Sequence, residues 1–153
     1  MNRERGESAR VRCRTLERSR DLRRLRANCS RVVERQTRRV LVIDDNSDIT
    51  DLLEWGLARL GYDVRTANDG HTGLEAAIEF RPHAALIDLS LPVIDGWTLA
   101  VRFHDHPVLA RSRLIAMTGH SSSAHRTRSA QSGFDHHVVK PVSLARLDAL
   151  LSA

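Results

Sequence analysis

The stretch VLVIDDN at residues 40–46 decides how the rest of the chain is interpreted. Its segment VLVID (40–44) is aliphatic and rich in β-branched residues, which favours a buried strand, and the polar cluster that begins at Asp45 ends it. Residues 47–60 then carry apolar side chains at helical spacing, and Gly61 ends that pattern. A strand followed directly by an amphipathic helix predicts the first βα unit of an α/β fold.

The same alternation continues to the end of the sequence. We expect further strands at residues 62–67, 84–88, 113–118 and 134–139, and further helices at residues 71–80, 96–106, 121–132 and 143–151. Five strand–helix units with short connections predict an α/β fold with a doubly wound, five-stranded parallel sheet and helices on both faces. In such sheets the reactive site lies beyond the carboxyl ends of the strands.

The first 39 residues differ from the rest of the chain in charge. Residues 1–39 contain 14 Arg against five acidic residues, whereas residues 40–153 contain 10 basic and 14 acidic residues. The net charge of +5 therefore comes from the first segment. We predict two parts: a basic arm at 1–39, either disordered or a single helix, and a folded domain at 40–153.

Composition disfavours several classes of protein. Aromatic residues make up 4% of the chain, too few for a surface that stacks on nucleobases. The sequence contains no run of about 18 apolar residues, so we expect no membrane span. Residues 1–10 lack the apolar core of a secretory signal. We therefore expect a soluble protein of the cytoplasm.

Acidic, hydroxyl and amino side chains stand at the carboxyl ends of the predicted strands. These residues are Asp44, Asp45, Asp88, Thr118 and Lys140. Because the carboxyl ends of parallel strands meet at one edge of a sheet, we expect these side chains to lie close together. A single acidic residue at a strand end often caps the next helix, but capping is a poor account of all five residues together.

The chemistry of these residues points to phosphoryl transfer. Three carboxylates at one edge repel one another, and a hard divalent cation such as Mg²⁺ relieves that repulsion. An aspartate can act as nucleophile and form an acyl phosphate, and an ammonium and a hydroxyl can bind the remaining phosphoryl oxygens. Lys140 is the only lysine among 24 basic residues. This is either an accident of composition or a sign that a compact ammonium is needed where a guanidinium fork would not serve.

Four segments in this order resemble the receiver (CheY-like) domain of two-component response regulators. They are VLVIDDN (40–46), ALIDLSLPVIDGW (85–97), RLIAMTGH (113–120) and GFDHHVVKP (133–141). The wording of the last segment is most similar to receivers attached to hybrid histidine kinases. The resemblance covers residues 40–153 and implies a flavodoxin-like sheet with the strand order 2-1-3-4-5.

The resemblance also implies roles for the acidic residues. Asp88 would be the phosphoacceptor, and Mg²⁺ would be its cofactor. Asp44, Asp45 and Asp88 would hold the metal together with the backbone carbonyl of Ser90.

The remaining residues of the site would bind the phosphoryl group and report its presence. The resemblance implies that Thr118 and Lys140 bind phosphoryl oxygens and that Thr118 acts with His137 as a switch. Many receivers carry Tyr or Phe at the position of His137. An imidazole is smaller than those rings, and its charge depends on pH.

The function implied by the resemblance is that of a stand-alone response regulator. It would accept a phosphoryl group on Asp88 from a histidine kinase or a phosphotransfer protein and signal through a surface that binds a downstream protein. It would not be an enzyme beyond slow self-dephosphorylation. Two alternatives remain open: residues 1–39 could bind nucleic acid or an anionic surface as an effector, or the chain could be a Mg²⁺-dependent phosphohydrolase, a class that usually has a second acid where this chain has Ser90.

Overall fold

The computed structural model describes residues 38–119 and 131–153. The predicted basic arm, apart from its last two residues, and most of the predicted helix at 121–132 lie outside the described residues. The elements below therefore concern the domain that follows the arm.

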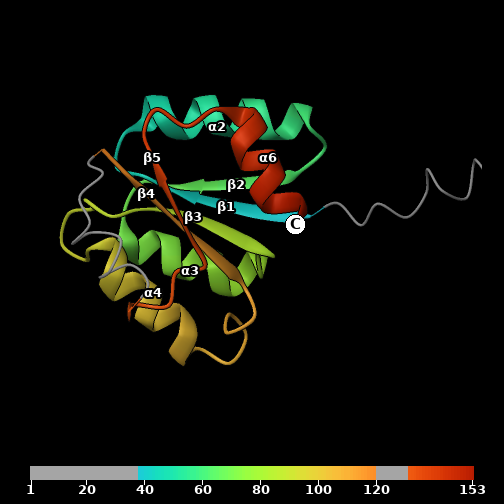
Figure 1. The fold of residues 1–153 in the computed structure, drawn as a ribbon. Helices are drawn as coiled ribbons and strands as arrows, with labels where there is room; N and C mark the ends of the chain where they lie inside the picture. The colour runs from blue at the N-terminus through green and yellow to red at the C-terminus, as the bar shows by residue number, and fades with distance from the viewer. Residues whose placement is uncertain (1–37, 120–130) are drawn as a thin grey trace, which may run out of the picture. The chain divides into compact units, whose positions relative to one another are not determined.

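The sheet has the predicted architecture. Its strands are β1 (Arg39–Ile43), β2 (Asp63–Ala67), β3 (Ala84–Asp88), β4 (Arg113–Thr118) and β5 (His136–Val139). All neighbouring strands pair in parallel, and their order across the sheet is β2-β1-β3-β4-β5 (Figure 1). The structure thus confirms the doubly wound, flavodoxin-like fold with strand order 2-1-3-4-5.

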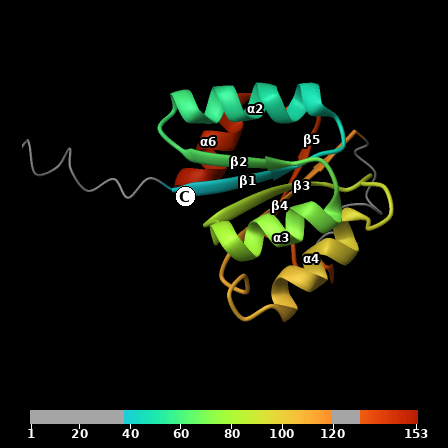
Figure 2. The ribbon, with the colours of Figure 1, turned by 180° about the vertical axis from the view of Figure 1, so that it is seen from behind.

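Two described helices cover each face of the sheet. They are α2 (Ser47–Arg59) and α6 (Leu144–Ser152) on one face, and α3 (Gly70–Phe80) and α4 (Gly96–Asp105) on the other (Figures 1 and 2). Because both faces are covered, the central strands are apolar on both sides. Val40 and Val42 of β1 pack with α2 and α6, whereas Leu41 and Ile43 pack with α3 and α4.

Polar side chains begin the helices where the strands end. Asn46, Asp69, Asp95 and Ser143 are the N-caps of α2, α3, α4 and α6, and each side chain accepts a hydrogen bond from a backbone N–H of the first turn. Such caps satisfy donors that have no partner within the helix. The capping role is therefore filled by residues other than the acidic residues at the ends of β1 and β3.

The last strand is shorter than expected. We predicted a strand at 134–139, but β5 begins at His136. The two residues before it make other contacts: Phe134 is buried in the core, and the Asp135 carboxylate accepts a hydrogen bond from the backbone N–H of Leu114. The backbone N–H of Asp135 still donates to the carbonyl of Leu114 at 2.9 Å, so the side chain takes only the N–H of Leu114, which a backbone carbonyl would otherwise bind in the ladder.

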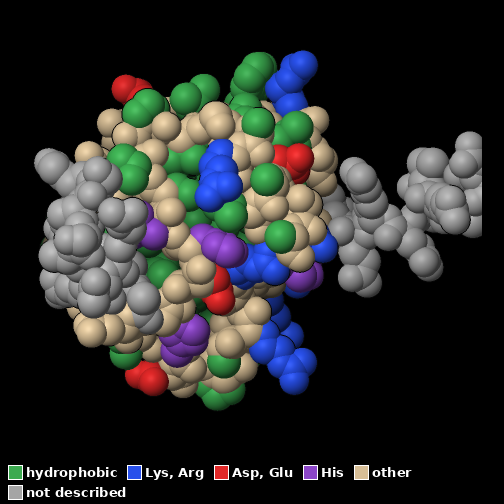
Figure 3. Space-filling model, in the orientation of Figure 1, with side chains coloured by type: hydrophobic (Ala, Val, Ile, Leu, Met, Phe, Trp, Pro, Cys, Tyr) green, Lys and Arg blue, Asp and Glu red, His purple; other side chains and the backbone are tan. Residues whose placement is uncertain are grey.

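Some apolar side chains remain exposed, and several of them lie on α2. Leu52 and Trp55 are 63% and 60% exposed, and hydrophobic atoms are visible over α2 in the space-filling view (Figure 3). The Arg59 guanidinium lies over the Trp55 ring, 4.8 Å from its centroid. This contact covers part of an indole that the core does not enclose.

The first residue of α4 lies directly against the end of β3. A Cβ atom on Gly96 would overlap the backbone oxygen of Asp88 and come within 2.9 Å of the Leu89 Cα atom. Only a glycine allows helix and strand to approach so closely here.

We expect Gly96→Ala to lower the free energy of unfolding by about 2 kcal/mol, because the backbone that carries Asp88 must shift. Gly119→Ala is the matched control, since a Cβ atom there would meet nothing within 4 Å, and we expect a change within about 0.5 kcal/mol. Urea denaturation measures both values. Equal stability of the two variants would contradict the close approach.

Candidate functional site

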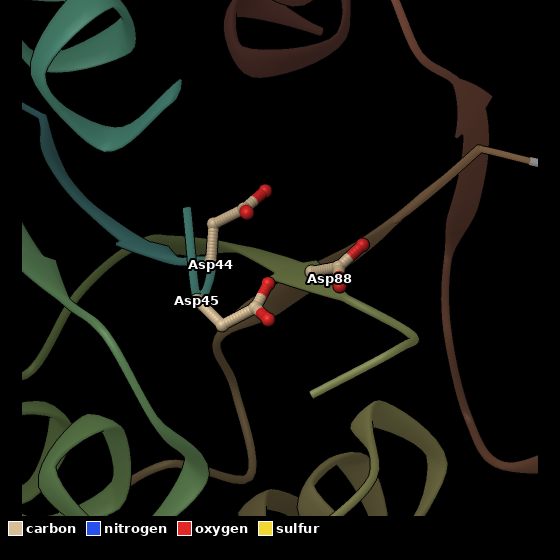
Figure 4. Close-up of side chains that lie close together, drawn as sticks. All are labelled: Asp44, Asp45 and Asp88. Atoms are coloured by element: carbon tan, nitrogen blue, oxygen red, sulfur yellow. The ribbon is translucent and has the colours of Figure 1, made fainter. Parts of the chain in front are cut away.

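Three acidic side chains come together at the carboxyl ends of β1 and β3. Asp44 and Asp45 follow β1, and Asp88 is the last residue of β3. Carboxylate oxygens of the three residues lie within 4.8 Å of one another, and the side chains extend into the same space (Figure 4). The strand pairing explains this, because β1 and β3 are neighbours in register up to Ile43 and Ile87.

The two buried carboxylates are fixed by the backbone next to them. Asp44 and Asp88 are 0% and 3% exposed, whereas Asp45 is exposed. The backbone N–H of Asn46 donates to Asp44 Oδ1 at 3.1 Å, and the backbone N–H of Ser90 donates to Asp88 Oδ2 at 3.1 Å. These bonds orient the carboxylates and leave their other oxygens directed to the site.

Lys140 brings a positive charge to the same place from the edge strand β5. It directly follows β5, and its Nζ atom lies 2.5 Å from Asp44 Oδ2 and 2.9 Å from Asp88 Oδ1. Its side chain is 20% exposed. One ammonium thus bridges two buried carboxylates that belong to different strands.

The pKa of Asp88 and that of Lys140 both depart from their ordinary values. Burial raises the pKa of Asp88, and the hydrogen bond from Lys140 only partly offsets that effect. For Lys140, burial acts to lower the pKa, but hydrogen bonds to Asp44 and Asp88 outweigh it, so that the pKa is raised. The ammonium is therefore charged at neutral pH, which stabilises the paired carboxylates.

The predicted switch residues lie on the two strands beyond β3. Thr118 is the last residue of β4 and is 1% exposed. His137 lies in β5 opposite Ala116, is half-buried, and has its Nε2 atom enclosed. The backbone N–H of Lys140 donates to the carbonyl of Thr118 at 2.7 Å. The two phosphoryl-binding candidates are thereby tied to each other through the backbone.

The donor set suits a hard divalent cation. Carboxylate oxygens are the ligands that Mg²⁺ takes, and three of them close together leave a strong local excess of negative charge. Ser90 follows within two residues of Asp88, in an exposed loop. Its role as a carbonyl ligand, like the other individual roles in the site, remains a prediction.

Two features of the loop after β3 were missed by our sequence analysis. One is the close approach of Gly96 to the backbone of Asp88. The dipeptide Asp95–Gly96 indicates a turn, but the sequence pattern does not show that this turn lies against Asp88. The other is Val93, which is fully exposed and has a φ of +65°. A β-branched residue is rarely found in that conformation, and no sequence pattern would have indicated it.

The comparison with known families matches the described domain. Residues 40–152 fit the family model of the response regulator receiver domain. The chain is 39% identical over 117 residues to the transcriptional regulatory protein PrrA of Mycobacterium bovis, with 75% of this chain and 48% of PrrA covered. The chain thus spans about half the length of the curated relatives it matches.

Solved structures give the same result. The chemotaxis protein CheY4 of Vibrio cholerae shares the fold with a TM-score of 0.73 at 24% identity, over 76% of this chain and 97% of that one. The receiver domain of the sensor histidine kinase PA1611 from Pseudomonas aeruginosa, solved with a magnesium ion in its active site cleft, has a TM-score of 0.69 at 29% identity, over 75% of this chain and 94% of that one. The similarity therefore extends to receivers of both regulators and kinases.

Among the helices that the structure describes, none is long and apolar enough to cross a membrane.

The match over residues 40–152, the sheet order and the acidic cluster at the strand ends agree with one another. The chain belongs to the family of response regulator receiver domains.

Proposed function

We propose that Asp88 accepts a phosphoryl group and that the chain works as a phosphorylation-dependent signalling protein of a two-component system. The observation that carries this proposal is the contact of Lys140 with both Asp44 and Asp88, next to the exposed Asp45. A buried carboxylate beside an ammonium and two further acids has the groups needed to hold both a cation and a phosphoryl group.

The proposed reaction is a transfer between a phosphohistidine and Asp88. A carboxylate oxygen of Asp88 forms a bond to phosphorus, and the bond between phosphorus and the histidine nitrogen of the donor protein breaks. The nitrogen keeps the electron pair and regains a proton. Since the pKa of Asp88 is raised by burial, its ionised form depends on the ammonium of Lys140.

Mg²⁺ is the cofactor that we propose for this step. Asp44, Asp45 and Asp88 would hold it, with the backbone carbonyl of Ser90 as a further ligand. When bound, the cation would supply neutralisation of the charge on the phosphoryl oxygens. The exposed position of Asp45 favours exchange of the cation with solvent, and Asp44, which contacts Lys140 in the structure, would share its carboxylate with the cation.

Lys140 and Thr118 would bind the phosphoryl oxygens. The ammonium already lies 2.9 Å from Asp88 Oδ1, so it can turn from the carboxylate to a phosphoryl oxygen on the same side chain with little movement. Thr118 is fixed at the end of β4 by its backbone bond to Lys140. We propose that the hydroxyl of Thr118 follows the phosphoryl group and that the ring of His137 moves with it.

The partners follow from the same proposal. A histidine kinase or a phosphotransfer protein would supply the phosphoryl group, and a downstream protein would bind the surface near β5 and α6. PrrA is named as a transcriptional regulator, and regulation of transcription is one process to which such a receiver can belong. We place the protein in the cytoplasm, where such kinases present their phosphohistidine.

A first prediction concerns the phosphoacceptor. With Mg²⁺ and acetyl phosphate as a small donor, we expect the protein to gain one base-labile phosphoryl group, and we expect Asp88→Asn to gain none. Asp105→Asn, which removes an exposed carboxylate from the end of α4, should be labelled like the wild type. Intact-protein mass spectrometry measures the gain. Equal labelling of Asp88→Asn would refute the assignment.

A second prediction concerns the metal. We expect Mg²⁺ to raise the thermal midpoint, because it binds the folded state. At a concentration of ten times Kd, the free energy of unfolding should rise by about 1.4 kcal/mol. Asp45→Asn should lose most of this dependence, because it removes the exposed ligand. Asp48→Asn, an exposed residue in the first turn of α2, should keep it. Identical responses of the two variants would place the cation elsewhere.

A third prediction concerns the lysine. Without Mg²⁺ we expect Lys140→Met to lower the free energy of unfolding by about 2 kcal/mol, because two buried carboxylates lose their counter-charge. Saturating Mg²⁺ should restore a large part of that loss. Arg146→Met removes an exposed cation nearby and should change stability by no more than about 0.5 kcal/mol. Denaturation with and without Mg²⁺ measures this; a loss that Mg²⁺ leaves unchanged would contradict the bridge.

A further inference from the structure

A second polar site lies at the opposite end of the sheet from the acidic cluster. A pocket of about 270 Å³ opens at the amino ends of β1, β3 and β4, where α6 ends. The strands between the two sites are about five residues long, which separates the sites by roughly 15 Å. The pocket therefore shares no residue with the acidic cluster.

Four arginine residues line this pocket. They are Arg38, Arg39, Arg111 and Arg113. Figure 3 shows basic and histidine side chains on the side of the molecule where β1 begins and α6 ends. Cations gathered around one concavity produce a positive potential, because its low-dielectric walls focus the field.

Three of these arginines have a partial structural role. Arg38 and Arg113 each donate from Nη1 to a carbonyl of the last turn of α6, those of Leu151 and Leu150. Arg39 donates from Nε to the carbonyl of Arg81. Each of these bonds uses one of the five N–H donors of a guanidinium. The Arg39 guanidinium also lies over the Phe80 ring, 6.0 Å from its centroid, so it is directed to the end of α3. The donors of Arg38 and Arg113 that α6 does not use stay available to a ligand.

None of these arginines forms an ion pair with a carboxylate within the residues that the structure describes. The ion pairs of 38–119 and 131–153 involve Arg65, His71 and Lys140 but none of the four pocket arginines. Ala153 borders the pocket without forming an ion pair with them. The carbonyl end of α6 contributes about half a negative charge, which is far less than the charge of four guanidinium groups.

His83 supports the same conclusion from within the pocket. Its Nδ1 atom accepts a hydrogen bond from the backbone N–H of Arg39 at 3.0 Å. Burial lowers the pKa of His83, and the charges of Arg39 and Arg38 lower it further. The neutral imidazole is thus one more sign of an excess of positive charge that the folded domain leaves uncompensated.

We propose that this pocket binds the phosphate groups of a small phosphorylated molecule, with a diphosphate group as the fitting unit. Guanidinium groups match phosphate oxygens with pairs of parallel N–H bonds. The four arginines surround a volume that suits a compact ligand rather than an extended one. Arg111 carries the clearest evidence, because it is exposed and no described residue holds its guanidinium.

The test uses the full chain and inorganic diphosphate as the probe. Titration in EDTA removes Mg²⁺, so that the carboxylates of the acidic cluster repel the probe instead of binding it through a metal. We expect saturable binding by calorimetry, together with NMR shifts of backbone amides at the starts of β1, β3 and β4. Arg111→Gln should weaken binding about tenfold, since it removes a charged donor at the pocket wall.

Two controls separate the pocket from the rest of the basic chain. Arg102→Gln removes an exposed arginine from α4 and should bind diphosphate like the wild type. Arg113→Gln should weaken binding as Arg111→Gln does, which guards against a fold defect in either variant. Wild-type affinity in both pocket variants, or amide shifts confined to residues outside the pocket, would overturn the proposal.

A duplex oligonucleotide titrated in parallel distinguishes the source of the phosphate. If the pocket serves a small molecule, Arg111→Gln should weaken diphosphate binding and leave oligonucleotide binding unchanged. A variant that loses only oligonucleotide binding would overturn the small-molecule proposal. This test is independent of the proposed phosphorylation. Because the pocket lies at the other end of the strands from Asp88, Asp88→Asn should bind diphosphate like the wild type.

Discussion

The ammonium of Lys140, held between the carboxylates of Asp44 and Asp88, is the interaction on which the functional edge of the domain depends. Two buried carboxylates at neighbouring strand ends repel each other in a medium that screens poorly. The sheet order brings the two carboxylates together, because β1 and β3 are adjacent, Asp44 directly follows β1 and Asp88 is the last residue of β3. Lys140 meets both at hydrogen-bond distance, and it reaches them from β5, two strands beyond β3. This ion pair therefore links the edge strand β5 to the inner strands β1 and β3.

Much of this arrangement could be predicted from the sequence, and the reasons are physical. Apolar runs such as 84–88 have the length and composition of strands buried on both faces, and residues such as Asn46 and Asp95 mark helix starts by their capping chemistry. Parallel strands then bring their carboxyl ends to one edge, which places Asp44 near Asp88. The positive φ of Val93 could not be predicted in this way. Val93 is the central residue of a three-residue turn in which the N–H of Ile94 donates to the carbonyl of Pro92 at 2.7 Å, and β-branched residues rarely adopt that conformation. The early end of the ladder before His136 depends on a long-range bond, that of Asp135 to Leu114.

The basic pocket was hidden from the sequence for a different reason. Its arginines occur in two distant stretches, at 38–39 and 111–113, within a chain that uses arginine almost everywhere. Only the parallel sheet reveals the cluster, because it brings the amino ends of β1, β3 and β4 together. The same topology thus places acidic groups at the carboxyl ends of the strands and basic groups at their amino ends. The choice of cation differs between the two edges: a compact ammonium touches two carboxylates at one, whereas forked guanidinium groups surround an open volume at the other.

The order of contacts on β4 and β5 indicates how a charge at Asp88 could reach the surface. The backbone N–H of Lys140 is bonded to the carbonyl of Thr118, so the backbones that carry the two groups proposed to bind phosphoryl oxygens are held next to each other. A new dianion on Asp88 would attract the ammonium away from Asp44, and the freed Asp44 carboxylate would need another partner. A bound divalent cation provides that partner, which explains why metal binding and phosphorylation should support each other at this edge. If the proposed motion reaches β5, the ring of His137 would move with it, and the size and charge of that ring would then affect the response of the outer surface.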